Sequence, residues 1–244
     1  MSVRWRSYPD AHAAAVAAAG HILALLDDAL AGPERATMAV SGGSTPKLLF
    51  EELVKARYQW ERVHLFFVDE RAVPPTDPAS NYKLAEDFLI NPAHFPRRNV
   101  HRIQGEIAPE RAAEHYTDDI RNFFGLKEGE MPHFDIIQQG MGAEGHTASL
   151  FPGEPLIEDR EGIAAAVFVP IAPQWRITLL PGVLLAARHT VFLVCGEDKA
   201  PAVHSVFHDD YDPMRLPAQV VSHHGRSVVW FLDDAASPLL RESE

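Results

Sequence analysis

FDIIQQGMGAEGHTASLFPG, residues 134–153, is the stretch on which the predicted fold depends most. It begins with a short apolar run at 134–137 that predicts a buried strand. The chain then enters a loop with three glycines, which allow positive φ and close backbone approach, and His146 stands where this loop should meet the next element. Ligands bind at the carboxyl ends of strands in open α/β sheets, and imidazole titrates near neutral pH. The loop is therefore either part of a catalytic site or a glycine-rich connection with a histidine in it by chance.

The rest of the chain alternates predicted strands with predicted helices. The strand candidates are continuous apolar runs rather than alternating ones, which is typical of a mainly parallel sheet with helices on both faces. The predicted strands lie at 36–40, 63–68, 100–103, 134–138, 189–194 and 227–232, and further apolar segments lie at 163–169 and 175–180. The predicted helices lie at 47–58, 80–90, 109–124, 181–188 and 197–208. The sequence thus predicts an α/β fold, and we expect one domain over residues 1–244.

The N-terminal segment admits two interpretations. Arginines before an alanine-rich run resemble part of a signal peptide, whereas Pro9-Asp10 is typical of a helix start and Gly32-Pro33 of a helix end. We expect a surface helix whose apolar face carries Val16, Leu23, Leu26 and Leu30. No stretch was expected to reach the length of a transmembrane span.

Composition limits the classes of partner. The chain has 22 basic and 34 acidic residues and a formal net charge of −12, which argues against nucleic acid or an anionic membrane as a partner. An anionic small ligand stays compatible, because a few local donors can outweigh the overall field. The single cysteine, Cys195, excludes an internal disulfide and fits a reducing compartment. We therefore expect a cytoplasmic protein in which Cys195 is a buried core thiol.

A second glycine loop, SGGSTP at 41–46, follows the predicted strand at 36–40. Its backbone N–H groups and hydroxyls would point at a helix N-terminus, where the dipole favours an anion, and Pro46 suits the first helical position. The spacing is neither a Walker A motif nor a dinucleotide fingerprint. It predicts a monophosphate site, with an ordinary capped helix as the alternative. The candidate ligands are Ser41, Gly42, Gly43, Ser44 and Thr45.

Three charged residues, Asp69, Glu70 and Arg71, directly follow the apolar run at 63–68. Unpaired buried charge is costly, so these residues form either a solvated turn or part of a ligand cleft at the strand end. In a cleft, Arg71 would suit a phosphate or carboxylate oxygen. Arg176 and Lys199 are further cations near strand ends or helix starts, although either one alone is typical of a solvated surface residue.

The thirteen histidines do not predict a metal site. His204 and His208 could share a helix face, but the HExxH pattern and paired cysteines are missing, so we expect no metal. A GxSxG nucleophile elbow is missing too, which disfavours covalent serine catalysis. A histidine that activates water is the simpler mechanism.

Taken together, these stretches resemble the 6-phosphogluconolactonase family. The matching segments are SGGSTP at 41–46, DERAVP at 69–74, SN at 80–81, GMGAEGHTASLFPG at 140–153, RITL at 176–179 and GEDKA at 196–200. The resemblance implies a Rossmann-like α/β fold and the hydrolysis of 6-phospho-D-glucono-1,5-lactone to 6-phosphogluconate in the oxidative pentose phosphate pathway. It implies no cofactor, and a small sugar-phosphate lactone as the substrate.

The resemblance also implies roles for individual residues. His146 would act as the general base on water, oriented by Glu144, which stands where the family usually has Asp. The strand before this loop ends in Gln138 and Gln139, where an apolar residue is more usual before the glycine. The other implied site residues are Arg71, for catalysis and phosphate binding, Arg176 and Lys199, for phosphate or sugar hydroxyls, and Asp69 and Gly142, for the substrate.

Two other functions are compatible with such a fold. A sugar-phosphate deaminase or isomerase would carry an aromatic residue in place of Arg71 and an Asn-Glu-Pro sequence after its histidine loop. A non-catalytic sugar-phosphate sensor would need a DNA-binding segment, and the first thirty-odd residues supply only an alanine-rich helix. These differences favour the lactonase.

Overall fold

The structure is a computed structural model that describes residues 4–32 and 34–241. Its centre is a seven-stranded sheet in the order β1-β10-β9-β6-β2-β3-β5, and every adjacent pair in it is parallel. Three antiparallel strands form a second sheet in the order β4-β8-β7. The predicted α/β class and mainly parallel sheet are confirmed. The strands are β1 (Arg4–Tyr8), β2 (Ala36–Val40), β3 (Val63–Phe67), β4 (Asp69–Arg71), β5 (Val100–His101), β6 (Ile136–Gln139), β7 (Ala164–Val169), β8 (Gln174–Leu179), β9 (His189–Val194) and β10 (Val228–Asp233).

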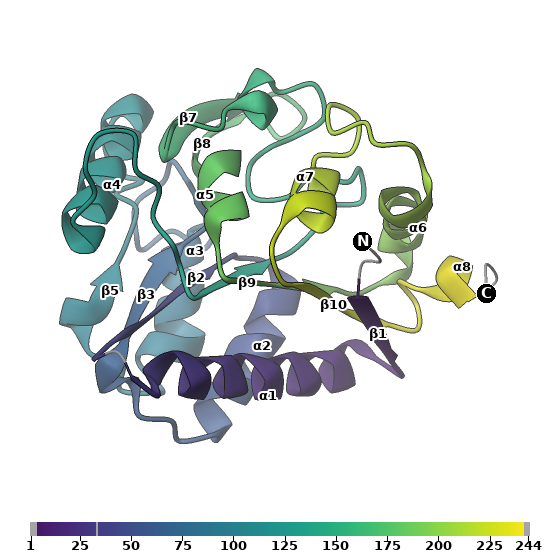
Figure 1. Ribbon diagram of the computed structural model, residues 1–244, viewed down its shortest axis with the longest axis horizontal. Helices are drawn as coiled ribbons and strands as arrows, with labels where there is room; N and C mark the ends of the chain where they lie inside the picture. Colours follow the sequence, from purple (N-terminus) through teal and green to yellow (C-terminus); the bar gives the residue numbers. More distant parts are fainter. Residues whose placement is uncertain (1–3, 33, 242–244) are drawn as a thin grey trace.

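Helices cover both faces of the large sheet, as the continuous apolar strands predicted. Helices α1 and α2 lie on one face, and α5 and α7 lie on the opposite face (Figure 1). The helices are α1 (Ala11–Leu30), α2 (Ser44–Lys55), α3 (Asn81–Ala85), α4 (Pro109–Phe124), α5 (Pro181–Ala186), α6 (Ala200–His208), α7 (Ala218–His224) and α8 (Pro238–Arg241).

The core lies between the large sheet and these helices. Strand β2 is buried along its whole length, and aromatic side chains fill the space beside the neighbouring strands. Phe192 stacks on Trp230 with 4.1 Å between ring centroids, and Phe66 meets Phe134 edge-on at 5.1 Å. Close packing of this kind makes the strands a rigid support for the loops at their ends.

Helix α1 begins where the sequence predicted, but its buried face differs. The Asp10 side chain caps the helix by accepting a 2.8 Å hydrogen bond from the backbone N–H of Ala13. Val16 is 46% exposed, so its placement on the apolar face was wrong. The small side chains of Ala14, Ala15 and Ala18 instead let the helix pack closely, and they define the buried face with Ile22. The predicted stop at Pro33 lies outside the described residues.

The same helix bears on the membrane prediction. With 20 residues, α1 is long and apolar enough to cross a membrane by length and composition, contrary to the expectation from the sequence. A core helix of a globular protein and a signal sequence both meet that criterion. Here α1 packs on α2 and on strands β9 and β10.

Several elements differ from the sequence prediction. Helix α2 begins at Ser44 rather than near Pro46, because Gly43 has a φ of 116° and turns the chain into the helix two residues earlier. Strand β4 lies where the sequence predicted either a solvated turn or part of a ligand cleft at a strand end. Its three charged residues carry no apolar periodicity, so only the pairing with β8 reveals it as a strand. Strand β1 and helix α7 were not predicted.

Candidate active site

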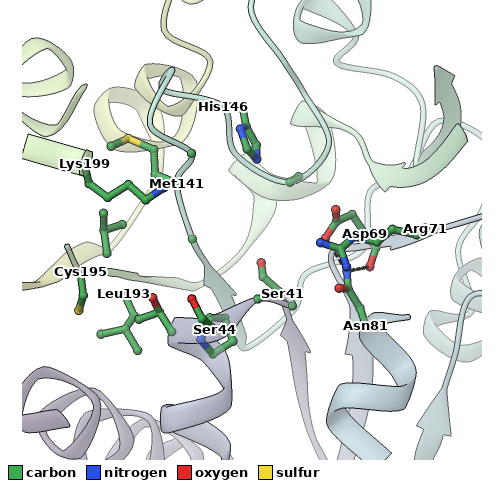
Figure 2. A pocket seen from close by; sticks show the side chains of 18 of the residues that line it. Ser41, Ser44, Asp69, Arg71, Asn81, Met141, His146, Leu193, Cys195 and Lys199 are labelled. Carbon is green, nitrogen blue, oxygen red and sulfur yellow. Dashed lines mark hydrogen bonds between the residues drawn. The ribbon is translucent and has the colours of Figure 1, made fainter. Parts of the chain in front are cut away.

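The site lies at the carboxyl ends of four neighbouring strands, β9, β6, β2 and β3. The chain continues from β2 to β3 on one side and from β6 to β9 on the other, so the strand order reverses between β2 and β6. Such a switch point opens a crevice for ligands. A pocket of about 200 Å³ is found there (Figure 2). It is lined by Ser41, Gly42, Gly43, Ser44, Thr45, Pro46, Asp69, Arg71, Asn81, Gly140, Met141, Gly142, His146, Ala148, Arg176, Leu193, Val194, Cys195 and Lys199.

The pocket brings together every predicted site residue except Glu144, which lies behind His146. The loop at 41–45, here called the phosphate loop, joins β2 to the N-terminus of α2. Gly43 adopts a φ of 116°, a conformation that favours glycine. A Cβ on Gly42 would lie 1.8 Å from Asn81 Oδ1, so only glycine fits there. The Ser41 hydroxyl donates to the backbone carbonyl of Gln138, which leaves its oxygen lone pairs rather than its proton free for a ligand.

Asp69, the first residue of β4, is held in a fixed position just beyond the end of β3. Its carboxylate accepts hydrogen bonds from Asn81 Nδ2 at 3.2 Å and from the Ser149 hydroxyl at 2.6 Å. Asn81 Nδ2 also donates to the Asp69 backbone carbonyl at 2.9 Å. Asp69 is only 5% exposed but lines the pocket, so it presents a pre-oriented acceptor to a ligand.

Glu70 faces the other way and serves the fold. Side chains alternate along a strand, and the Glu70 carboxylate accepts backbone N–H groups of Arg71, Asn81 and Tyr82 and the hydroxyl of Ser80. Burial raises the pKa of Glu70, although these four hydrogen bonds oppose that rise. Through these hydrogen bonds Glu70 links β4 to the N-terminus of α3, and it lies outside the pocket.

Two arginines face each other beside the pocket. Arg71 on β4 and Arg176 on β8 are partners in the antiparallel register. Arg71 Nη1 donates to the Ala79 carbonyl at 2.5 Å, while the buried Nε atoms of both arginines have no hydrogen-bond partner among the described residues. Burial lowers the pKa of Arg176, and the nearby Arg71 adds to this while Asp69 opposes it. This pair of underused cationic donors is suited to an anionic ligand.

His146 points into the pocket from the loop after β6 (Figure 2). Its ring stacks on Phe151 with centroids 4.0 Å apart, which limits rotation of the imidazole. The Nδ1 atom lies 3.0 Å from Glu144 Oε1, a close electrostatic contact that is not aligned as a hydrogen bond. His146 beside it holds the pKa of Glu144 at about 2, and Lys199 acts in the same direction. The longer carboxylate thus reaches the histidine and stays ionised.

The loop that carries His146 is closed on itself. The Gly142 N–H donates to the His146 carbonyl at 2.9 Å, and the Gly145 N–H donates to the Gly142 carbonyl at 3.0 Å. A Cβ on Gly142 would lie only 2.0 Å from His146 Nδ1, so the imidazole occupies the space that a side chain would need. The histidine is therefore positioned by its own loop as well as by Phe151.

Sequence reasoning missed two polar residues of the pocket. Asn81 was expected only to cap a helix, and the signal that it does more is its place directly after Ser80, opposite the end of β3. Cys195 was expected in the core but lines the pocket, because β9 ends at Val194. Burial raises the pKa of the Cys195 thiol to about 12, so the group is protonated and unreactive at neutral pH.

Residues that could bind a metal are dispersed over the fold. Among residues 4–32 and 34–241, no group of three or more His, Cys, Asp or Glu side chains could hold a metal ion. His204 and His208 do share a face of α6, but their rings stack on each other with centroids 4.6 Å apart.

The comparison with known proteins agrees with this geometry. The sequence model of a family described as glucosamine-6-phosphate isomerases/6-phosphogluconolactonase matches residues 9–230. The chain belongs to this family. A 6-phosphogluconolactonase of Synechocystis is 35% identical over 214 residues, which are 87% of this chain and 88% of that protein. The human 6-phosphogluconolactonase is 38% identical over 212 residues, 84% of this chain and 81% of that protein. The crystal structure of a 6-phosphogluconolactonase from Shewanella baltica superposes with a TM-score of 0.85, at 27% identity over 95% of this chain and 98% of the other.

Proposed function

We propose that this member of the family hydrolyses 6-phospho-D-glucono-1,5-lactone to 6-phospho-D-gluconate, with His146 as the general base. The observation that carries the proposal is the shared pocket, in which an anion cradle at a helix N-terminus and a fixed imidazole face the same space. Relatives named 6-phosphogluconolactonase match most of the chain. The two sheets both line this pocket, so we treat residues 1–244 as one catalytic domain.

Substrate binding begins with the phosphate group. The N–H groups of residues 42–45 and the dipole of α2 favour a bound dianion. Ser41 adds no donor, because its N–H and its hydroxyl both donate to Gln138. Arg71 and Arg176 supply cationic donors beside the loop, and Lys199 supplies another from the opposite wall of the pocket. Near the ligand these local cations outweigh the overall acidic field of the chain, whose formal net charge of −12 already includes them. Asp69, fixed by Asn81 and Ser149, is placed to accept hydrogen bonds from sugar hydroxyls.

The chemistry needs no covalent intermediate, because a δ-lactone is an activated ester. His146 takes a proton from water as the water oxygen attacks the lactone carbonyl carbon. The carbonyl oxygen becomes an oxyanion, which backbone N–H groups of the glycine loop other than those of Gly142 and Gly145 would stabilise, because these two already donate within the loop. Collapse of this intermediate breaks the ring C–O bond, and the proton held by His146 passes to the leaving ring oxygen. Glu144 stabilises the imidazolium formed between these steps.

The phosphate and the base act together in this scheme. Anchoring the phosphate holds the lactone carbonyl within reach of the water beside His146, so binding contributes orientation as well as affinity. We also propose a cytoplasmic location, which the single unpaired cysteine of the chain supports.

The test measures acid release from the lactone generated in situ, after the uncatalysed rate is subtracted. The wild-type protein should accelerate hydrolysis, and His146→Ala should lower kcat by roughly 10²–10⁴-fold while it still binds 6-phosphogluconate. His115→Ala is the matched control, because His115 is exposed and lies outside the pocket. Unchanged turnover in His146→Ala would disprove the assigned base, and an inactive wild-type protein would disprove the function.

A further inference from the structure

Two adjacent glutamines occupy the carboxyl end of β6, in the middle of the large sheet. Gln138 and Gln139 are both fully buried, although buried amides are costly unless they are hydrogen-bonded. Each one contacts a different loop of the pocket, and neither lines the pocket itself. They therefore contact the site without being available to touch the substrate.

Gln138 holds the start of the phosphate loop. Its side-chain Oε1 accepts the backbone N–H of Ser41 at 3.1 Å, and its backbone carbonyl accepts the Ser41 hydroxyl at the same distance. A backbone N–H can only donate, so the amide of Gln138 must present its oxygen to Ser41. Both contacts fix the residue from which the phosphate loop departs.

Gln139 holds the loop that carries His146. Its side-chain amide contacts the hydroxyl of Thr147 at 2.6 Å, and the same hydroxyl lies 2.9 Å from the Gly140 carbonyl. The hydroxyl has one proton and cannot donate to two oxygens at full strength. If the Gln139 amide is turned so that Nε2 donates to Thr147, the hydroxyl is free to donate to Gly140. That orientation also gives a partner to the buried Nε2 of Gln139, which otherwise has none.

Gln138 and Gln139 are adjacent in β6, and this explains why they contact different loops. Successive side chains of a strand point to opposite faces of the sheet, so one strand end can hold one loop from each face. We propose that Gln138 and Gln139 are separate positioning residues, Gln138 for the phosphate loop and Gln139 for the histidine loop. Gln138 thereby governs substrate binding, and Gln139 governs the placement of the base. This inference rests on the proposed lactonase function.

The experiment compares the kinetic constants on the lactone, and the melting temperatures, of four single variants and one double variant. Gln138→Leu should raise KM about tenfold with kcat within about twofold. Loss of the bond to Ser41 removes roughly 1 kcal/mol that holds the phosphate loop in place, and substrate binding must then supply that free energy. Gln139→Leu should lower kcat about 10- to 100-fold with KM within about twofold, since small displacements of a catalytic group have effects of this size. Ile137→Val, on the same strand and fully buried, controls for lost core stability.

Thr147→Val is the fourth variant, because it breaks the Gln139 contact from the other side. It should lower kcat like Gln139→Leu, and the double variant should be no slower than the worse of the two single variants. A general loss of stability would move KM and kcat together, or would appear equally in Ile137→Val. Either of those results, or additive losses in the double variant, would overturn the proposal. An inactive wild-type protein is a different result, since it would refute the lactonase function itself.

Discussion

Gly142→Ala should remove most of the catalytic power of the site while it leaves the fold intact. The added Cβ would lie 2.0 Å from His146 Nδ1 and 2.5 Å from Glu144 Oε2, whereas ordinary contacts begin near 3.4 Å. The imidazole must therefore withdraw by about 1.4 Å. Misplacement of about 1 Å costs roughly 10²-fold in rate, which corresponds to about 2.7 kcal/mol of lost transition-state stabilisation.

Stability should change little in this variant. The backbone of Gly142 is outside the positive-φ region, so alanine adds no backbone strain there. Restriction of the unfolded chain contributes about 0.4–1 kcal/mol of stability, which offsets part of the cost of moving the imidazole. The assay is lactone hydrolysis by kcat, with a thermal melt on the same samples. Gly20→Ala in α1 is the control, because no atom lies within 4 Å of its added Cβ and it lies outside the pocket, so it should keep the wild-type kcat. Full kcat in Gly142→Ala would refute the close packing of the loop around His146.

Two further predictions follow from other contacts. Gly42→Ala would place its Cβ 1.8 Å from Asn81 Oδ1 and displace Asn81 from Asp69. We therefore expect the KM for the lactone to rise roughly tenfold and the free energy of unfolding, measured in urea, to fall by about 1–3 kcal/mol. Unaltered KM and stability would show that Asn81 does not hold Asp69. The pKa of His64 is lowered from 6.5 to about 4, chiefly by burial and then by His101. The unfolded chain binds this proton more readily, so stability present above pH 6.5 should be lost as the pH falls through about 4. Urea unfolding of His64→Gln should show a shallower acid decline, and an unchanged decline would contradict the assignment.

Much of the fold could be predicted from the sequence because its strongest signals are local. The continuous apolar strands and the helix at 109–124, which ends at Gly125 in the left-handed conformation, needed no long-range information. The three-stranded sheet could not be foreseen, since β4 consists of three charged residues whose only strand signal is a partner about a hundred residues away. Val16 is exposed because the buried face of α1 consists of four alanines with Ile22, Leu25 and Leu26, and alanines carry too weak an apolar signal to reveal that face in the sequence.

The residues that line the candidate site could be predicted from the sequence, whereas the hydrogen bonds that hold them in place could not. Glycine loops and charges at strand ends pointed to residues 41–45, Arg71 and His146, which all line one pocket in the structure. The contacts behind them were not visible, because a buried glutamine or an asparagine in a capping position carries no local sign of its distant partner. Glu70 illustrates the limit, since it is adjacent to two pocket residues but faces α3.

The pairing of β1 with β10 has a consequence for how the protein is made. These are the first and last strands that the structure describes, and they lie side by side in parallel at one edge of the sheet. During synthesis, β1 leaves the ribosome long before β10 has been made, so the backbone N–H and C=O groups of β1 stay unpaired until β10 is available. Such distant pairings slow folding, and unpaired strand edges favour aggregation. Short length and the arginines Arg4 and Arg6 in β1 are features that protect a strand during such a delay.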